Sequence, residues 1–334
     1  MVEKFKSIGT YFYESVLRHE NKTALVDQNI QLTYRELYSL ATSVSLIIEE
    51  NQERIKVQEV VAVCTEKNRF AVSALFGILQ AGRVYLPIDL DYPEARIKFL
   101  LEDSGTKLII TDQHTQNKIE KIIRENQLDI KIYNAENLQI STIPNVYEVK
   151  AKDCDLAYLI YTSGTSGIPK GVEVEHCQLF QLLEWCNSET LAMGCASTLQ
   201  FSPLSFDPSL LEIFTTLLNG KKLFMLDSNQ RKDITFLLAF IISNNIERLF
   251  IPVAILNLLS EEILDSGRIP LSVKEINCGG DKMIITQAIR EALKKIPQVR
   301  LNNQYGPTEA AIMVTNKVMI GDPAIWPHSP GIGE

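Results

Sequence analysis

The sequence predicts an α/β protein with two doubly wound, mostly parallel sheets that are packed with helices. Segments with the period of an amphipathic helix alternate with short apolar runs typical of buried strands along most of the 334 residues. Such alternation indicates parallel strands joined by crossover helices that cover both faces of a sheet. We expect one sheet from each half of the chain, with ligands bound at the carboxyl ends of the strands.

The expected elements follow from these two periods. Helices are expected over residues 8–19, 34–49, 69–80, 177–189 and 208–218, and Pro93 begins another at its favoured first turn. Strands are expected over residues 60–65, 107–111, 129–133, 156–160, 197–201, 222–226, 248–251, 273–278 and 299–303. Residues 136–152 have weak periodicity, which favours a loop with a short strand.

The composition is ordinary for a globular protein, with 46% apolar and 22% charged residues. A net charge of −8 without a Lys/Arg cluster disfavours nucleic-acid binding. No apolar run approaches the ~18 residues of a membrane span, and the first residues lack a signal-peptide core. The six cysteines include no C-x-x-C pair, so we expect free, mostly buried thiols and a cytoplasmic location.

A loop rich in Gly, Ser and Thr follows the apolar run at residues 156–160. Residues 162–171 read T-S-G-T-S-G-I-P-K-G. Glycines let a backbone approach phosphates, hydroxyls donate hydrogen bonds, and the single cation, Lys170, offsets negative charge. The spacing is not that of a Walker A loop. A plain Gly/Ser linker is the alternative, which the Pro-Lys-Gly ending disfavours.

This loop resembles the signature loop of adenylate-forming enzymes. Four further segments, in the family order, resemble the amino-acid adenylation domains of nonribosomal peptide synthetases. They are residues 32–37 (L-T-Y-R-E-L), 79–89 (L-Q-A-G-R-V-Y-L-P-I-D), 206–209 (F-D-P-S) and 303–309 (N-Q-Y-G-P-T-E). The resemblance covers nearly the whole chain. It implies a first α/β subdomain over about 1–155, a second over 156–315 that holds the ligands, and the start of a small β-barrel over 316–334.

The implied reaction joins an amino acid to ATP, with Mg²⁺, to give an aminoacyl-AMP that is loaded onto the phosphopantetheine thiol of a carrier protein in natural-product biosynthesis. Two negative groups must meet, so catalysis consists mainly of positioning and charge neutralisation. By the resemblance, the β- and γ-phosphates are held by Thr162, Ser163, Gly164, Thr165, Ser166, Gly167 and Lys170. Adenine is surrounded by Gly279, Gly280, Asn303 and Tyr305, while Thr308 contacts the α-phosphate and Glu309 binds Mg²⁺.

Four of these residues, Thr162, Lys170, Thr308 and Glu309, are the candidates for catalysis. Taken alone, Glu309 could be a solvated surface charge, and the Gly-Gly pair at 279–280 could be an ordinary turn. His176, after the phosphate loop, is expected to be a structural hydrogen-bonding histidine.

Asp207 has two possible roles. An aspartate before Pro208 at a strand–helix junction is typical of a helix N-cap. In the resemblance, the aspartate of F-D-x-S binds the α-amino group of the substrate, which would point to an amino acid rather than an aryl or fatty acid.

The resemblance also implies a side-chain pocket, lined by Asp207, Pro208, Leu211, Phe250, Ile276, Cys278, Gln304, Ile312 and Met313. Leu211 and Phe250 could equally be plain core residues. The set is mostly apolar and has no Lys or Arg. Proline-activating members carry D-V-Q-F-I-A-H-V-V, and this chain shares the Asp, Phe and Ile. Proline or another cyclic or aliphatic amino acid is therefore the expected substrate.

The family continues beyond the last residues of this sequence, with a C-terminal subdomain that carries a charge-neutralising lysine. We therefore expect this chain to be the large N-terminal core, which binds ligands but turns over slowly. Its start before the first helix resembles a free-standing enzyme. The alternatives are an acyl- or aryl-CoA ligase and a catalytically silent nucleotide-binding protein.

Overall fold

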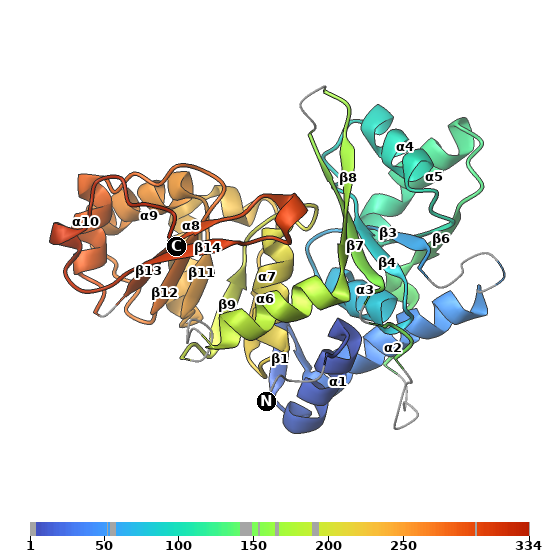
Figure 1. Ribbon diagram of the computed structural model, residues 1–334, viewed down its shortest axis with the longest axis horizontal. Helices are drawn as coiled ribbons and strands as arrows, with labels where there is room; N and C mark the ends of the chain where they lie inside the picture. Colours follow the sequence, from blue (N-terminus) through green and yellow to red (C-terminus); the bar gives the residue numbers. More distant parts are fainter. Residues whose placement is uncertain are drawn as a thin grey trace.

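Two β-sheets and three layers of helices form the protein in a computed structural model (Figure 1). The structure describes residues 5–51, 53, 58–140, 149–152, 154–163, 167–188, 194–297 and 299–333. The strand–helix alternation expected from the sequence is confirmed, as is the α/β class with two mostly parallel sheets.

The larger sheet has eight strands in the order β14-β13-β12-β11-β9-β10-β1-β2. These are β1 (Thr23–Asp27), β2 (Ile30–Thr33), β9 (Ser197–Gln200), β10 (Lys222–Met225), β11 (Arg248–Phe250), β12 (Glu275–Cys278), β13 (Arg300–Tyr305) and β14 (Thr315–Met319). Neighbouring strands are parallel except at the two edges, where β2 pairs with β1 and β14 with β13 in antiparallel fashion.

The smaller sheet has six strands in the order β6-β5-β3-β4-β7-β8. These are β3 (Val60–Cys64), β4 (Val84–Pro87), β5 (Leu108–Thr111), β6 (Lys131–Asn134), β7 (Leu156–Thr162) and β8 (Lys170–Glu175). Only the β7–β8 pair is antiparallel. Runs such as V-V-A-V-C in β3 are apolar throughout because helices cover both faces of this sheet.

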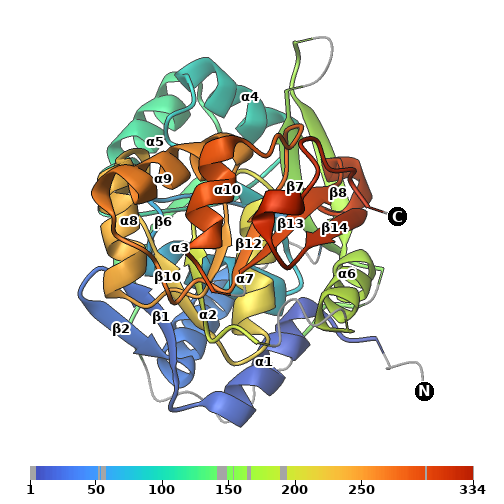
Figure 2. The ribbon, with the colours of Figure 1, turned by 90° about the vertical axis from the view of Figure 1, so that its left-hand side faces the viewer.

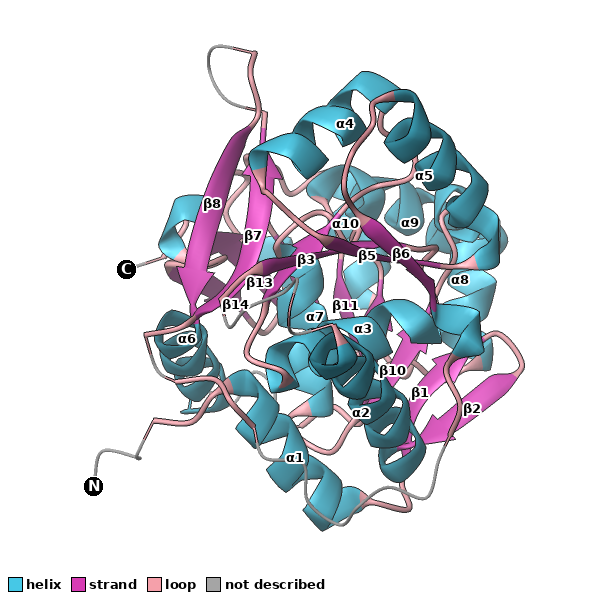
Figure 3. Ribbon diagram, turned by 90° about the vertical axis from the view of Figure 1, so that its right-hand side faces the viewer, coloured by secondary structure: helices cyan, strands magenta, loops and turns pink. Residues whose placement is uncertain are grey.

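The helices form one layer between the sheets and one outside each sheet (Figures 2 and 3). The inner layer shares one apolar core with both sheets and contains α1 (Ile8–His19), α2 (Tyr34–Glu50), α3 (Arg69–Gln80), α6 (His176–Ser188) and α7 (Pro208–Leu217). Outside the smaller sheet lie α4 (Glu94–Asp103) and α5 (Gln113–Glu125). Outside the larger sheet lie α8 (Ile234–Ser243), α9 (Val253–Ser266) and α10 (Gln287–Lys294). Short 3₁₀ helices are η1 (Ala135–Asn137), η2 (Gln230–Lys232), η3 (Thr308–Ala310) and η4 (Pro323–Ile325).

The sheets do not follow the two halves of the chain, contrary to our expectation. The N-terminal strand β1 pairs with β10 in the larger sheet, where Leu25 lies opposite Leu223. Conversely, β7 and β8 complete the smaller sheet. In this arrangement the apolar side chains of β1 are buried on both faces of the sheet. Burial of apolar surface stabilises the pairing of β1 with a strand that is distant in the sequence. Residues 316–334, where the start of a barrel was expected, include most of β14, which extends the larger sheet.

The first family-like motif, at residues 32–37, serves to start a helix. Thr33 is the N-cap of α2: its hydroxyl accepts a hydrogen bond from the amide of Glu36 at 3.2 Å. In return, the Glu36 carboxylate accepts one from the amide of Thr33 at 2.7 Å. This reciprocal pair is a capping box, so the motif has a local structural explanation.

The longest described helix, α2, has 17 residues, and no helix in the described ranges combines the length and hydropathy of a membrane span.

The contact between α2 and α3 generates a test of the inner layer. A Cβ atom on Gly77 of α3 would lie 2.4 Å from the Ala41 carbonyl oxygen and 2.5 Å from Cβ of Val44. Alanine is the better helix former by about 1 kcal/mol, but overpacking costs about 1–3 kcal/mol, and both helices are held by the sheets. We expect Gly77→Ala to lower the free energy of unfolding, measured by urea denaturation.

The matched control is Gly194→Ala, because a Cβ there meets no atom of the described residues within 4 Å. Its effect is expected to stay within about 0.5 kcal/mol. A Gly77→Ala protein as stable as the parent would contradict the close approach of the two helices.

Candidate active site

A cavity of about 590 Å³ lies at the carboxyl ends of β9, β11, β12 and β13. This is the edge where open α/β sheets bind ligands. The structure brings together here ten residues expected from the sequence, which are Asp207, Pro208, Leu211, Phe250, Gly279, Gly280, Gln304, Thr308, Ile312 and Met313. They come from α7, from three strand ends and from the segment after β13, so only the fold makes them neighbours.

Asp207 lies at the start of α7 and is 8% exposed. It occupies the N-cap position, but its backbone is helical and its side chain makes no capping hydrogen bond, so the cap alternative does not explain it. Its Oδ2 atom is buried without a hydrogen-bond partner among the described residues. Burial raises the pKa of Asp207 from 3.8 to about 6, a hydrogen bond with Thr308 opposes the rise, and the negative charge of Glu309 adds to it.

The rest of the F-D-P-S segment holds Asp207 in place. Pro208 begins α7 at a position where its missing N–H is not needed. The hydroxyl of Ser209 donates a hydrogen bond to the Phe206 carbonyl at 2.7 Å, which closes the turn before the helix. A buried carboxylate with one oxygen left without a hydrogen bond is costly, and a fixed backbone prevents it from turning towards solvent.

The segment after β13 folds back on itself to form another wall. A Cβ on Gly306 would lie 2.4 Å from the Ile312 carbonyl oxygen, so only glycine allows this approach. Ala311 and Ile312 have φ angles of 57° and 77°, in the left-handed region that a β-branched residue rarely enters. The amide of Val314 donates to the Tyr305 carbonyl at 2.8 Å and closes the loop. The strained backbone thus supports Ile312 and Met313 as parts of the cavity wall.

The residues expected around adenine divide into two groups. Gly279 and Gly280 line the cavity, and Gly280 has a φ of 88° that favours glycine. Tyr305 is the last residue of β13, and its side chain is half exposed. Asn303 is buried, and its Nδ2 donates to the Gly331 carbonyl at 2.9 Å instead of facing the cavity.

The pocket expectation needs a correction on β12. Ile276 and Cys278 do not line the cavity but belong to the apolar core outside the larger sheet, with α9 and α10. Side chains alternate along a strand, so the residue between them, Asn277, faces the cavity. Its Oδ1 accepts hydrogen bonds from Asn302 and Gln304, both at 2.9 Å. Asn277 therefore fixes the amide of Gln304, and strand alternation was the signal that could have identified it.

The cavity also has charged residues that were not expected. Arg231 of η2 and Asp281 after Gly280 both line it. The residue set implied by the resemblance has no Lys or Arg, and the cavity lining adds Arg231 to it. Arg231 belongs to the connection between β10 and α8, which carries no motif, and its place at the site depends on the strand order of the larger sheet.

The phosphate loop joins the antiparallel strands β7 and β8, with Thr162 opposite Lys170. In Figure 1 the two strands project beyond the rest of the smaller sheet. Ser163 and Gly167 are described, whereas Gly164, Thr165 and Ser166 lie outside the described residues. Lys170 is exposed, as is Glu309 of η3, and β8 contacts η3. Within the described ranges, the cavity lining includes no residue of this hairpin.

His176, at the start of α6, has a structural contact. It is fully buried, and its Nδ1 accepts a hydrogen bond from the Ile8 amide at 3.3 Å. Burial lowers the pKa of His176 to about 4, so the ring is neutral at pH 7. The contact ties α1 to α6, as expected for a structural histidine.

The fold is that of an adenylate-forming ligase core, and residues 12–333 match the model of the family described as AMP-binding enzyme. The chain belongs to this family. It is 32% identical over 333 residues to gramicidin S synthase 2 of Brevibacillus brevis, covering 98% of this chain and 7% of that protein. It is 33% identical over 333 residues to bacitracin synthase 3 of Bacillus licheniformis, covering 95% and 5%. The chain thus spans less than a tenth of the length of these relatives.

Solved structures share the fold. A variant of the nonribosomal peptide synthetase FmoA3 superposes with a TM-score of 0.85 at 23% identity, over 99% of this chain and 34% of that chain. VinN, in a complex with L-aspartate, superposes with a TM-score of 0.81 at 20% identity, over 96% and 80%.

The raised pKa of Asp207 makes a prediction about stability. The folded protein binds this proton more tightly than the unfolded chain, so the stabilising contribution is complete below pH 3.8 and is lost as the pH rises through about 6. We expect Asp207→Asn, which stays neutral, to be more stable than the parent at pH 8 by up to roughly 3 kcal/mol, and similar at pH 4. Urea unfolding at the two pH values measures the difference.

The control for this prediction is Asp265→Asn at the exposed end of α9, which should change little at either pH. Equal stabilities of parent and Asp207→Asn at pH 8 would mean that the carboxylate is not desolvated.

Proposed function

We propose that this protein activates an amino acid with ATP, forming an aminoacyl-AMP and pyrophosphate. The observation that carries the proposal is the buried Oδ2 of Asp207 in the 590 Å³ cavity, which has no hydrogen-bond partner among the described residues. Burial of a carboxylate is costly, the hydrogen bond with Thr308 offsets only part of this cost, and an ammonium group is the ligand that would offset the rest. An acyl or aryl acid offers no such group, so a substrate with an amino group fits this site best.

ATP would occupy the part of the same cavity at the ends of β12 and β13. Gly279 and Gly280 allow adenine to approach the backbone, and Thr308 provides a hydroxyl for the α-phosphate. Thr162, Ser163, Gly167 and Lys170, with the rest of the phosphate loop, would hold the β- and γ-phosphates from the β7–β8 hairpin. Contact between β8 and η3 supports this role, since it links the hairpin to the segment that carries Thr308.

Glu309 is the residue that would bind Mg²⁺. Its carboxylate is exposed on η3, next to Thr308, and a hard cation prefers carboxylate and phosphate oxygens. Bound Mg²⁺ would neutralise phosphate charge as the amino-acid carboxylate attacks. Within the described ranges no group of three or more His, Cys, Asp or Glu gathers around a common point, so phosphate oxygens would complete the ligand set.

Proline, or another cyclic or aliphatic amino acid, is the substrate we propose. The apolar side chains of Leu211, Phe250, Ile312 and Met313 line the cavity that holds Asp207. Contact with these side chains would favour an apolar substrate side chain, by about 0.8 kcal/mol for each CH₂ group of the substrate that becomes buried. Arg231 lines the same cavity, so acidic amino acids belong among the compounds tested.

The acceptor of the activated amino acid would be the phosphopantetheine thiol of a carrier protein. This step follows from the resemblance to adenylation domains and from similarity to peptide synthetases.

The test of the proposed function combines exchange and binding. ATP–pyrophosphate exchange would be measured with proline, pipecolate, leucine, valine, phenylalanine, tyrosine, glutamine, aspartate and glutamate, with benzoate and a fatty acid as controls. Because binding does not require turnover, calorimetry with non-hydrolysable aminoacyl sulfamoyl adenosines would run in parallel. We expect selective binding of one or two amino-acid derivatives, and Asp207→Ala to weaken it by about a hundredfold or more.

Other outcomes would replace the proposal. Exchange with benzoate or the fatty acid alone would make the protein an acyl ligase and leave Asp207 without a substrate role. Binding of nucleotide without any acid would identify a silent nucleotide-binding protein.

The Mg²⁺ role of Glu309 has its own test. We expect Glu309→Gln to raise the Mg²⁺ concentration needed for half-maximal ATP binding by about tenfold or more. The matched control is Glu291→Gln on the exposed side of α10, which should leave the Mg²⁺ dependence unchanged. An unchanged dependence in both variants would remove Glu309 from the metal site.

A further inference from the structure

Two buried and oppositely charged side chains, Lys67 and Glu212, lie beside the cavity but have no part in the proposed reaction. Lys67 follows β3 of the smaller sheet and is 7% exposed. Glu212 lies in α7, one residue after Leu211 of the cavity wall, and is fully buried. Charged residues of these types are rarely buried unless they are paired or hydrogen-bonded.

Both side chains bind the same short segment at the end of β9. Lys67 Nζ donates to the carbonyl oxygens of Phe201 at 2.7 Å and Gln200 at 3.3 Å. The Glu212 carboxylate accepts from the amides of Phe201 and Ser202, both at 3.0 Å. It also accepts from the Ser202 hydroxyl at 2.7 Å and from Gln200 Nε2 at 2.8 Å. The strand ends at Gln200, so these side chains replace the hydrogen bonds that a neighbouring strand would have made.

The segment that they hold is part of the substrate cavity. Phe201, Ser202 and Pro203 line the cavity, and the chain then runs directly to Asp207. Lys67 reaches this segment from the smaller sheet, whereas Glu212 reaches it from α7 above the larger sheet. The two side chains therefore connect the cavity wall to both halves of the inner layer.

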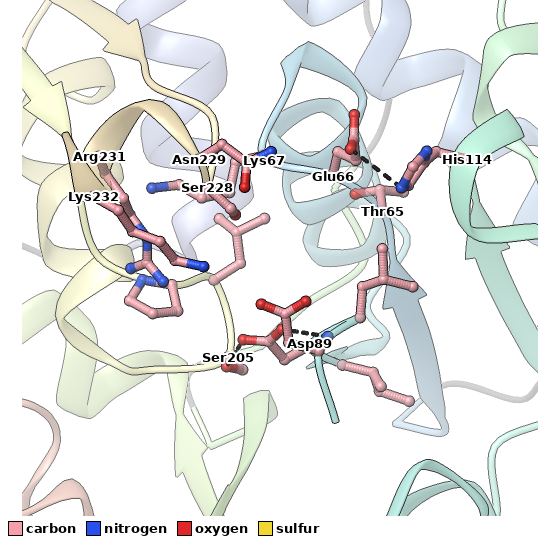
Figure 4. A pocket seen from close by; sticks show the side chains of 15 residues that line it. Thr65, Glu66, Lys67, Asp89, His114, Ser205, Ser228, Asn229, Arg231 and Lys232 are labelled. Carbon is pink, nitrogen blue, oxygen red and sulfur yellow. Dashed lines mark hydrogen bonds and ion pairs between the residues drawn. The ribbon is translucent and has the colours of Figure 1, made fainter. Parts of the chain in front are cut away.

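A second, polar cavity of about 160 Å³ shows where the halves meet (Figure 4). Lys67 lies at its wall, with Glu66, Asp89 and His114 from the smaller-sheet side and Arg231 from the larger-sheet side. The Ser205 hydroxyl donates to Asp89 across this boundary at 3.4 Å, a longer contact than that of Lys67 with Phe201. Of these two hydrogen bonds between the halves, that of Lys67 is therefore the shorter, and it lies next to the substrate cavity.

The pair is electrostatically interdependent. Burial lowers the pKa of Lys67, and the negative charge of Glu212 is the strongest effect that raises it again. Of the smaller effects, the positive charge of Arg231 lowers this pKa, and the negative charges of Asp227 and Asp89 raise it. Burial raises the pKa of Glu212, and the positive charge of Lys67 opposes this most. Removal of one partner leaves the other as an uncompensated buried charge, whereas removal of both does not.

We propose that Lys67 and Glu212 are positioning residues for the amino-acid substrate, which fix residues 200–202 between the two sheets so that the cavity wall stays in register with Asp207. This inference rests on the proposed function of the site. It concerns the amino-acid side of the cavity, at the ends of β9 and α7. The side-chain hydrogen bonds that Lys67 and Glu212 make with described residues all go to residues 200–202, and none goes to the nucleotide side at the ends of β12 and β13.

The test separates the two sides of the cavity. We expect Lys67→Met to weaken binding of the preferred aminoacyl sulfamoyl adenosine by about tenfold to a hundredfold, while AMP binding changes by less than about twofold. Lys67→Arg keeps the charge and should recover most of the affinity. In exchange assays with the holoenzyme, KM for the amino acid should rise while KM for ATP stays constant.

Lys118→Met is the matched control, because Lys118 Nζ also donates to two backbone carbonyls, of Leu90 at 2.6 Å and Tyr92 at 3.0 Å, but lies outside the substrate cavity. It should leave both affinities unchanged. If Lys67→Met does not fold, Glu212→Gln and the double variant Lys67→Met/Glu212→Gln carry the test. The double variant should be more stable than the sum of the two single effects implies.

Two outcomes would overturn the inference. Equal loss of amino-acid and AMP affinity in Lys67→Met would show a general structural role, and unchanged affinity for both would show no positioning role. A parent protein that binds AMP but no aminoacyl derivative would instead refute the proposed function, which keeps the two failures distinguishable.

Discussion

The helix layer shared by the two sheets is the constraint on which the rest of the structure depends. In α3, every residue from Phe70 to Gln80 is buried, because the helix has protein on all sides. The sheets can approach only as closely as this layer allows, and Gly77 sets the separation of α2 and α3 within it. The cavity lies where the layer ends, at the start of α7.

The sequence predicted most, but not all, of the elements with strong periods. The helix at Ile8–His19 and apolar strands such as β3 were predicted because burial on one or both faces leaves a clear pattern, whereas the buried strands β1 and β4 were not expected. The edge strands β2, β8 and β14 were not expected either, since polar sequences such as K-G-V-E-V-E are tolerated at a sheet edge, although the edge strand β6 was expected over residues 129–133. The crossing of β1 into the larger sheet could not be predicted, since it depends on which distant edge offers a partner.

Site residues could be predicted where a sequence motif fixes the local backbone. They could not be predicted where only the fold brings a distant residue to the cavity. The F-D-P-S and Y-G-P-T-E segments carry their own turns, through Ser209 and Gly306, so their side chains lie together as expected. On β12 the pattern gave the right strand but the wrong face, and Asn277 took the place of Ile276 and Cys278. Arg231 and Lys67 carry no motif. Their importance depends on the strand order and on a contact between residues more than a hundred positions apart.

The left-handed backbone at Ala311 and Ile312 limits how this cavity wall can change. Glycine or asparagine would suit such φ angles better, yet the wall there is made from an apolar, β-branched side chain. The backbone path is therefore dictated by its surroundings, chiefly by the lack of a side chain at Gly306, and not by local preference. The shape of this wall can consequently be changed by exchanging side chains while the backbone path stays the same and Gly306 is kept. Alterations at Met313, whose neighbourhood reaches a second surface groove beside Trp185 of α6, have more room to act.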